Sequence, residues 1–324
     1  MKRIAVLTSG GDAPGMNAAI RAVVRSGIHA GMEVYGIERG YEGLLDNDIR
    51  RLQWSDAGDI IQRGGTVLKT ARCERFLQDE WIDVAAENLT GRSIDGVVVI
   101  GGDGTFRGGA KLAERGVTVV GIPATIDNDL AYTDFTIGFK TAVSTVLDLI
   151  TKIRDTSSSH ERTTIIEVMG RHCGDLALYA GITGGADAIL VPEVDVDIQG
   201  LVNTVRSGKK SGKLHNVIVK AEGVDIPLSE LAELLEKLTG QETRTVVPGY
   251  IQRGGSPVAE DRLLASLAGA KAVKLLDEHL DAGERKSFAI GMRGNKIFLM
   301  PLAAAINYKG SFNTDIYELA NVLG

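Results

Sequence analysis

Cysteine, aromatic residues and long apolar runs are all scarce in this chain of 324 residues. The two cysteines, Cys73 and Cys173, are far apart and match neither a disulfide framework nor a zinc-ligand spacing. No apolar stretch is long enough for a membrane-spanning helix, and the N-terminal segment has too few apolar residues for a secretory signal. We therefore expect a cytoplasmic protein that contacts no membrane.

A concentration of positive charge is also lacking. The 36 Lys and Arg residues are outnumbered by 42 Asp and Glu residues, and no basic tract could neutralise a phosphate backbone. We therefore expect no nucleic acid partner, and any small anion must be bound by local groups. The hydrophobic content of 44% is enough for two domains, each with its own core.

Short β-branched runs alternate with helical patterns. The continuous apolar runs predict parallel strands buried on both faces. These strands are expected at residues 3–9, 33–38, 96–102, 117–123, 163–169, 188–193, 216–222 and 244–250. Residues 15–28 and 139–153 each carry one apolar helical stripe. The alternation predicts a doubly wound α/β protein that binds ligands at the carboxyl ends of its strands.

Two glycine-rich loops each follow an expected strand. In "LTSGGDAPGMNAAI", Met16 and Asn17 stand where a P-loop has Lys and Ser or Thr, and in "VVVIGGDGTFRGG", Arg107 replaces the third glycine of a dinucleotide fingerprint. Either loop alone is compatible with an ordinary tight turn. Two such loops in one sheet, each with an Asp that we expect to be buried, favour polyphosphate binding at helix N-termini.

Acidic residues follow the same expected sheet edge. Asp103 in the second loop suits Mg²⁺, although an Asp that caps a turn is the alternative. The motif "TIDND" places Asp127 and Asp129 after the next strand. One carboxylate there can accept a hydroxyl proton while the other orients or shares the metal, and Thr125 can bind phosphate. A solvated Asx-turn cluster is the alternative.

Arginines should accompany phosphoryl transfer, because it concentrates negative charge. Arg171 and Arg253 each follow an expected strand in a glycine-containing turn, whereas an isolated surface Arg is more often solvated. Arg21 and Arg25, one helical turn apart, form either a second anion site or a solvated face. The segment "QRGG" occurs at residues 62–65 and 252–255, but so short a match does not establish a duplication.

Together the motifs resemble those of bacterial ATP-dependent 6-phosphofructokinases, in order and along the whole chain. They are "LTSGGDAPGMNAAIR", "VVIGGDGT", "TIDNDL", "RDTSSSHER", "EVMGRHCGD" and "IQRGGSP". The "GGDGT" motif alone is less specific, since it is similar to a motif of NAD kinases and diacylglycerol kinases. The whole series is specific.

The resemblance implies that Mg-ATP phosphorylates the 1-hydroxyl of fructose 6-phosphate, the committing step of glycolysis, in a homotetramer. It implies two doubly wound, Rossmann-like domains with mainly parallel sheets and an active site in the cleft between them. The ATP-binding domain would comprise residues 1–138 with 252–304. The sugar-phosphate-binding domain would comprise residues 139–251 with 305–324.

The resemblance also assigns roles to individual residues. Asp127 would be the general base, Asp129 its neighbour near the metal, Arg171 a stabiliser of the transferring phosphoryl and Thr125 a further catalytic residue. ATP would be bound by Gly11, Arg72, Cys73, Gly102, Asp103, Gly104 and Thr105, with Asp103 on Mg²⁺. The sugar phosphate would contact Thr125, Asp127, Met169, Gly170, Arg171, Glu222, Tyr250 and Arg253, and Arg162 and Arg244 of an adjacent subunit. An effector site for activating ADP and inhibiting phosphoenolpyruvate would comprise Arg21, Arg25, Arg154, Gly185, Asp187, Ser211 and Lys213.

Some positions depart from the family pattern. Tyr250 stands where a sugar-phosphate His is usual, and Trp54 and Ser211 stand where the effector site commonly has a basic residue, which predicts weaker effector binding. Gly104 and Ala124 leave room for a nucleotide where pyrophosphate users tend to have Asp and Lys, so we expect ATP as the donor.

Two alternatives remain at this point. One is a kinase for another phosphorylated acceptor, and the other is a nucleotide-sensing protein without catalysis. The intact "TIDND" motif and Arg171 argue against the sensor. The arginines at 162, 244 and 253 favour an acceptor that carries a phosphate.

Overall fold

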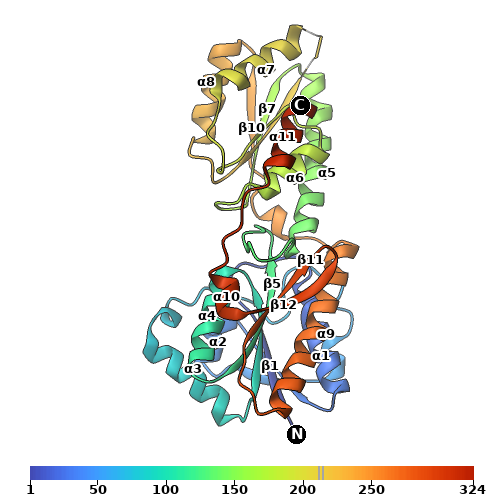
Figure 1. Cartoon of the computed structure of the whole chain (residues 1–324). Coiled ribbons are helices and arrows are strands. Elements are labelled where there is room, and N and C mark those ends of the chain that lie inside the picture. The colour runs from blue at the N-terminus through green and yellow to red at the C-terminus, as the bar shows by residue number, and fades with distance from the viewer. Residues whose placement is uncertain (211, 214) are drawn as a thin grey trace. The chain divides into compact units, whose positions relative to one another are not determined.

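The computed structural model describes residues 1–210, 212–213 and 215–324 (Figure 1). Ser211, which we assigned to the effector site, lies outside the described residues. The chain divides into two compact units. Unit 1 comprises residues 1–126, 130–141 and 253–310, and unit 2 comprises residues 127–129, 142–252 and 311–324.

Unit 1 is built on an eight-stranded sheet. Its order is β12 (Lys296–Pro301), β11 (Phe288–Arg293), β5 (Thr118–Thr125), β4 (Gly96–Gly101), β1 (Arg3–Thr8), β2 (Glu33–Ile37) and β3 (Ile49–Leu52), with β6 (Ile137–Gly138) paired to β5. Pairing is parallel from β11 to β2, whereas β3 and β12 are antiparallel edge strands. Every residue of β4 and β5 is buried, as expected for strands covered on both faces.

Helices flank both faces of this sheet (Figure 1). On one side are α1 (Met16–His29) and α9 (Ala259–Asp281), and on the other α2 (Gly40–Leu45), α3 (Asp79–Gly91) and α4 (Asp103–Glu114); α10 (Leu302–Ile306) follows β12. A Cβ on Gly269 would lie 2.6 Å from the Cβ of Ala22, so glycine lets α9 approach α1 closely.

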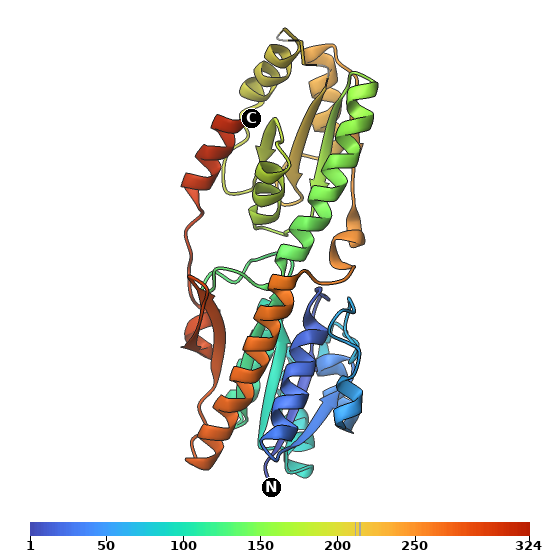
Figure 2. The ribbon, with the colours of Figure 1, turned by 90° about the vertical axis from the view of Figure 1, so that its right-hand side faces the viewer.

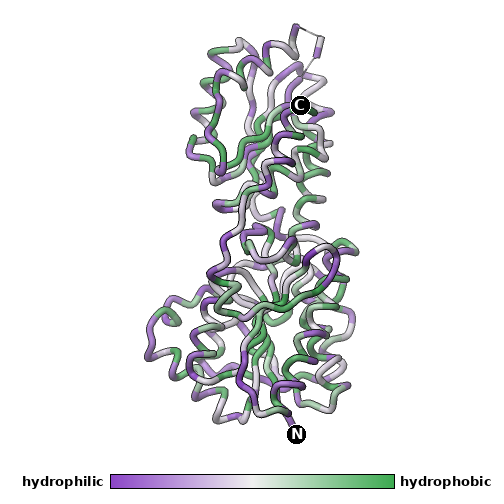
Figure 3. The backbone as a smooth tube through the Cα atoms, viewed as in Figure 1, coloured by the Kyte–Doolittle hydropathy of each residue, from purple (hydrophilic) through white to green (hydrophobic). Residues whose placement is uncertain are grey.

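Unit 2 contains a four-stranded, wholly parallel sheet. Its order is β10 (Thr243–Val246), β7 (Thr163–Val168), β9 (Asn216–Ala221) and β8 (Ala188–Leu190). The helices of this unit are α6 (Asp175–Thr183), α7 (Ile198–Lys210), α8 (Leu228–Thr239), α11 (Thr314–Leu323) and most of α5 (Phe139–Ser159) (Figure 2). Apolar residues concentrate on the strands of each unit (Figure 3).

The α/β fold class, with mainly parallel sheets, is confirmed. The expected strand at 244–250 is partly wrong: β10 ends at Val246, and a 3₁₀ turn occupies Gly249–Arg253. The sequence reading missed β3, β6, β11 and β12. The strand β3 contains two arginines and β6 has only two residues, so neither shows the continuous apolar run that identified the others, whereas β12 has such a run at 297–300. Within the described ranges, no helix combines the length and apolarity that crossing a membrane requires.

Candidate active site

The two glycine-rich loops lie side by side in unit 1. They follow β1 and β4, which are neighbouring parallel strands, and the Thr105 hydroxyl donates to the carbonyl oxygen of Ser9 at 2.9 Å. A Cβ on Gly101 would lie 2.5 Å from that same oxygen, so the loops can approach only with glycine there. The expectation that both loops belong to one sheet is confirmed.

Asp103 is not buried, contrary to our expectation. The helix α4 begins at Asp103 itself, which leaves the side chain 37% exposed and paired with Arg107 at 2.8 Å. Asp12 of the first loop is only partly buried as well. Next to Asp103, a Cβ on Gly104 would meet no atom within 4 Å. The start of α4 therefore presents a carboxylate beside open space.

The donor set of Asp103 suits Mg²⁺ bound together with phosphate. Mg²⁺ in phosphoryl-transfer sites is held by one or two carboxylates, with phosphate oxygens and water as the other ligands. Within the described part of the chain, no group of three or more His, Cys, Asp or Glu side chains could hold a metal by itself. The single carboxylate of Asp103 therefore fits a Mg²⁺ ion whose other ligands are phosphate oxygens and water.

The segment that carries Arg72 and Cys73 is attached to the first loop. The Thr70 hydroxyl donates to the carbonyl oxygen of Gly10 at 2.8 Å. Arg72 is exposed and Cys73 is partly buried. Burial, helped by a hydrogen bond with Glu42, raises the pKa of Cys73 to about 11, so this side chain is a neutral thiol at pH 7.

Arg253 also lies against the first loop. Its Nη1 donates to the carbonyl oxygen of Asp12 at 3.2 Å, and a Cβ on Gly11 would lie 2.4 Å from the same nitrogen. Gly11 therefore leaves the space that the guanidinium occupies. The structure places Arg253, predicted for the sugar phosphate, beside a residue predicted for ATP.

Thr125 lies next to the second loop. It is the last residue of β5, it is buried, and its carbonyl oxygen accepts a hydrogen bond from the Thr136 hydroxyl at 2.6 Å. A Cβ on Gly102 would lie 3.6 Å from the Cβ of Thr125. Unit 1 thus gathers Thr125 with the residues predicted for the nucleotide phosphates.

In unit 2, one arginine joins the two acids of "TIDND". Arg171 Nε lies 3.2 Å from Asp127 Oδ2, and its Nη1 lies 3.7 Å from Asp129 Oδ2. The Asp127 side chain is 2% exposed, the Asp129 side chain 22% and the Arg171 side chain 52%. Asn128 and Arg171 both adopt the left-handed backbone region, with φ of 53° and 54°. Strained backbone of this kind is concentrated at functional sites.

The turn before Arg171 is held by Glu222. Glu222 Oε1 accepts the backbone N–H groups of Gly170 at 3.1 Å and of Arg171 at 2.8 Å. The backbone N–H of Met169 donates to Gln252 Oε1 at 3.1 Å. Four of the residues predicted for the sugar phosphate are therefore brought together. Gln252, fully buried, was missed, although its place in "IQRGG" beside Arg253 could have identified it.

Arg162 and Arg244 lie away from this group, and Tyr250 is exposed. Arg162 directly precedes β7, and Arg244 is the second residue of β10, so both lie at the amino ends of the strands, whereas Arg171 follows the carboxyl end of β7. Arg244 is exposed and pairs with Glu242 at 2.5 Å. Tyr250 is 84% exposed on the turn after β10.

Part of the predicted effector set also comes together in unit 2. Arg154 donates to the carbonyl oxygens of Gly184 and Gly185 at 2.6 Å. The buried carboxylate of Asp187 pairs with Lys213 and accepts the N–H of Val217 at 2.7 Å.

His215, near the charges of Arg154 and Lys213, was not among the predicted residues. Its two ring nitrogens are buried, and none of the described residues hydrogen-bonds to them. Burial lowers the pKa of His215, and the nearby charges of Arg154 and Lys213 lower it further. Its position two residues after Lys213 was the available signal.

Arg21 and Arg25 lie on α1 in unit 1. The Arg25 guanidinium stacks over the Trp54 ring, with its carbon 4.7 Å from the ring centroid. A Trp at this position therefore holds the arginine by a cation–π contact.

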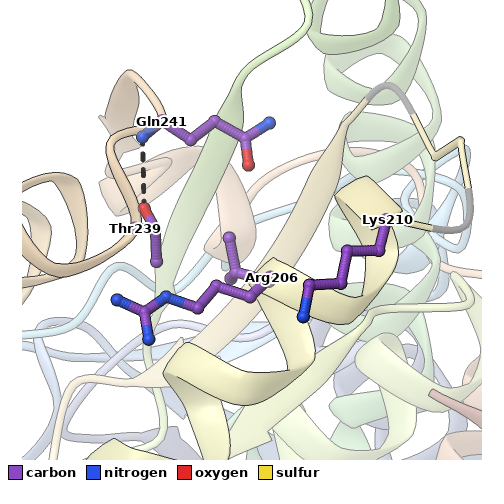
Figure 4. Close-up of a pocket in the computed structure, with 5 residues that line it drawn as sticks. Arg206, Lys210, Thr239 and Gln241 are labelled. Atoms are coloured by element: carbon purple, nitrogen blue, oxygen red, sulfur yellow. Dashed lines mark hydrogen bonds between the residues drawn. The ribbon is translucent and has the colours of Figure 1, made fainter.

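A hollow of about 330 Å³ lies at the amino end of β10, the opposite end of the sheet from Arg171 (Figure 4). Its lining is Val205, Arg206, Lys210, Thr239 and Gln241. The Gln241 backbone N–H donates to the Thr239 hydroxyl at 3.2 Å. None of these residues was predicted for a site, and the catalytic candidates contribute nothing to it.

Known proteins resemble this chain in sequence along its length. A sequence model of the family described as Phosphofructokinase matches residues 3–276. Proteins named ATP-dependent 6-phosphofructokinase are 55% identical in Alkaliphilus metalliredigens and 54% identical in Clostridium tetani, over 323 residues that span 100% of this chain and 99% of each relative.

Solved structures match as well. A phosphofructokinase structure from Saccharomyces cerevisiae is 36% identical to this chain, with a TM-score of 0.89. The match covers 100% of this chain and 47% of the longer yeast chain. A pyrophosphate-dependent phosphofructokinase from Marinobacter aquaeolei is 23% identical and shares the fold, with a TM-score of 0.83. That match covers 97% of this chain and 86% of the Marinobacter chain. The chain belongs to the phosphofructokinase family.

Proposed function

We propose that the protein transfers the terminal phosphoryl group of ATP to the 1-hydroxyl of fructose 6-phosphate, in the cytosol, as the committing step of glycolysis. The products are ADP and fructose 1,6-bisphosphate. Relatives that bear this enzyme's name are 51–55% identical along the whole chain. The observation that carries the proposal is the contact of Arg171 with both Asp127 and Asp129.

Asp127 acts as the general base. Its carboxylate takes the proton of the 1-hydroxyl while that oxygen bonds to the γ-phosphorus, and the bond to the bridging oxygen of ADP breaks. Arg171 stabilises the charge on the transferring group, because its half-exposed guanidinium has N–H donors beyond the two that face the carboxylates. Asp129 keeps this arginine oriented, and Thr125 contacts phosphate from the end of β5.

ATP binds the glycine loops of the domain formed by residues 1–138 with 252–304. Backbone N–H groups at Gly11, Gly102, Gly104 and the start of α4 meet its phosphates, and the helix end favours their charge. Thr105, Arg72 and Cys73 complete this set. Asp103 would hold Mg²⁺, which would neutralise the charge that develops on the phosphates during transfer.

Fructose 6-phosphate binds the domain formed by residues 139–251 with 305–324. Met169, Gly170 and Glu222 hold the sugar, and Arg253 with Tyr250 contacts its phosphate. Arg162 and Arg244 serve the site of an adjacent subunit in a homotetramer. This assignment is supported by their position at the amino ends of the strands, away from Arg171 in their own chain.

An effector such as ADP or phosphoenolpyruvate binds Arg154, Gly185, Asp187 and Lys213, together with Arg21 and Arg25. Support for a polar site here comes from the contact of Lys213 with Asp187 and from the buried ring nitrogens of His215, to which none of the described residues hydrogen-bonds. Binding is weaker than in relatives with a basic residue in place of Trp54.

The test is ADP release by the purified protein with Mg-ATP, with and without fructose 6-phosphate, with identification of the sugar product. Fructose 1,6-bisphosphate should form only when both substrates are present. Faster turnover with pyrophosphate than with ATP would contradict the proposal that ATP is the phosphoryl donor. ATP binding without any sugar product would favour another acceptor or a sensor.

A further inference from the structure

The backbone of Asn128 adopts an uncommon conformation between the two acids of "TIDND". Asn128 lies between Asp127 and Asp129 and has φ of 53°, in the left-handed region. This conformation is uncommon for a residue with a side chain, although Asn adopts it more readily than most. In this conformation both carboxylates reach Arg171, so a change in the backbone of Asn128 would move at least one of them away from the arginine.

Asn128 is held by the turn that follows Arg171. Its Nδ2 donates to Asp175 Oδ2 at 2.7 Å, and its carbonyl oxygen accepts from the Cys173 thiol at 3.9 Å. Asp175 is the first residue of α6, so the carboxylate is presented by the rigid start of a helix.

The same turn is fixed at several points. Cys173 N–H donates to the Gly170 carbonyl oxygen at 2.9 Å, and Gly174 N–H donates to Glu193 Oε1 at 2.8 Å. Asp175 is partly buried, and burial raises its pKa although the Asn128 bond lowers it. A hydrogen bond in such surroundings is worth more than one at the surface.

We propose that Asp175 is a positioning residue for phosphoryl transfer, which holds Asn128 in the left-handed conformation and so aims Asp127 and Asp129 at Arg171. This inference rests on the proposed function. Asp175 contacts neither substrate nor the reacting atoms in this role. Its effect belongs to turnover, because it sets the geometry of the base and leaves the binding groups in place.

The test is a double-mutant cycle on kcat and KM for fructose 6-phosphate and ATP. Asp175→Ala should lower kcat about 10- to 100-fold, the cost of a base displaced by about an ångström, with both KM values nearly unchanged. Asn128→Gly allows the left-handed backbone without strain but removes the side-chain bond, so kcat should also fall. The kcat of the double variant should lie within about twofold of that of Asp175→Ala, because both changes remove the same hydrogen bond.

Two further variants complete the cycle. Asp175→Asn keeps an oxygen that can accept from Asn128 and should retain most of the turnover. This variant also tests the inference if Asp175→Ala does not fold. Asp197→Ala is the matched control, because Asp197 accepts the Gly200 N–H at the start of α7 and touches none of these residues. Additive losses in the cycle, a loss confined to KM, or a large loss in Asp175→Asn would overturn the inference.

Backbone hydrogen exchange separates this inference from the proposed function. Exchange in residues 126–130 should be faster in Asp175→Ala than in the unaltered chain and unchanged in Asp197→Ala. Unaltered protein that forms no fructose 1,6-bisphosphate would refute the proposed function, while the exchange result still decides whether Asp175 holds the loop. Unchanged exchange in Asp175→Ala would refute the positioning role.

Discussion

Gly64 lies directly against Gly255, so that a Cβ on Gly64 would be 2.4 Å from the carbonyl oxygen of Gly255. The two copies of "QRGG" are therefore packed backbone to backbone in unit 1. Ser256 strengthens the contact, since its hydroxyl donates to the carbonyl oxygen of Gln62 at 2.8 Å. The Asn17 amide donates to the carbonyl oxygens of Arg63 at 3.0 Å and Gly64 at 3.2 Å.

The first prediction concerns this contact. Gly64→Ala should destabilise the protein by about 1–3 kcal/mol, because two backbones must separate to admit a methyl group. The midpoint of urea unfolding measures the change. Gly91→Ala is the control, since Gly91 is exposed on α3 and a Cβ there meets nothing within 4 Å. Equal midpoints for the two variants would show that the loops separate without cost.

The residues of the site differ in how far the sequence could predict them. The glycine loops, "TIDND" and Arg171 could be identified because each follows a buried strand, and the carboxyl ends of parallel strands converge at one edge. Asp175 could not, because its link to the site is a hydrogen bond with the Asn128 side chain, which is distant in sequence. The QRGG contact has the same character: its repeated letters were visible, but their approach depends on the fold.

The strands of the fold also differ in how far the sequence could predict them. Strands with continuous apolar runs, such as β4 and β5, were predicted from sequence because burial on both faces leaves few polar positions. The antiparallel edge strand β12 was missed although residues 297–300 are apolar, and its pairing with β11 depends on a turn at Gly294 and Asn295. The missed role of Asp175 and the missed strand β12 thus both depend on contacts that form only when the chain has folded.

A second prediction tests the base. Asp127→Asn should lower kcat by about 10²- to 10⁴-fold, the usual value of a positioned general base, because an amide cannot accept the hydroxyl proton. Steady-state kinetics with saturating ATP and fructose 6-phosphate measure it. Asp134→Asn serves as the control, since the Asp134 carboxylate accepts the Gly294 N–H at 2.7 Å in a turn of unit 1. A fall of only a few-fold at position 127 would assign proton transfer to another group.

A third prediction concerns Asp261, which is 1% exposed. Its Oδ2 accepts from both the backbone N–H (2.8 Å) and the hydroxyl (2.5 Å) of Thr141. Burial raises its pKa above the ordinary value of 3.8, so the folded chain binds this proton more tightly than the unfolded chain. Its contribution to stability is therefore complete below pH 3.8 and is lost as the pH rises through the folded pKa.

The measurement is the free energy of unfolding of the unaltered protein minus that of Asp261→Asn, across this pH range. The difference should become less favourable to the unaltered protein as pH rises. Glu42→Gln supplies the opposite case, because hydrogen bonds from Cys73 and Arg75 lower the pKa of Glu42 below 4.5. The stability that Glu42 contributes is present above that value and is lost as pH falls through the folded pKa. If the stability difference changed with pH in the same direction for both variants, the opposite pKa shifts assigned to Asp261 and Glu42 would be contradicted.

The fourth prediction concerns the two thiols. Burial raises the pKa of Cys73 from 9.0 to about 11 and that of Cys173 to about 12. Near pH 8 the reactive thiolate is therefore rarer than in an ordinary cysteine, by about 100-fold for Cys73 and about 1,000-fold for Cys173. Alkylation by iodoacetamide, followed by mass spectrometry, should be slow at both positions and slower at Cys173. Unfolding in urea should equalise and accelerate the two rates, whereas fast alkylation of folded Cys173 would show that its surroundings open to solvent.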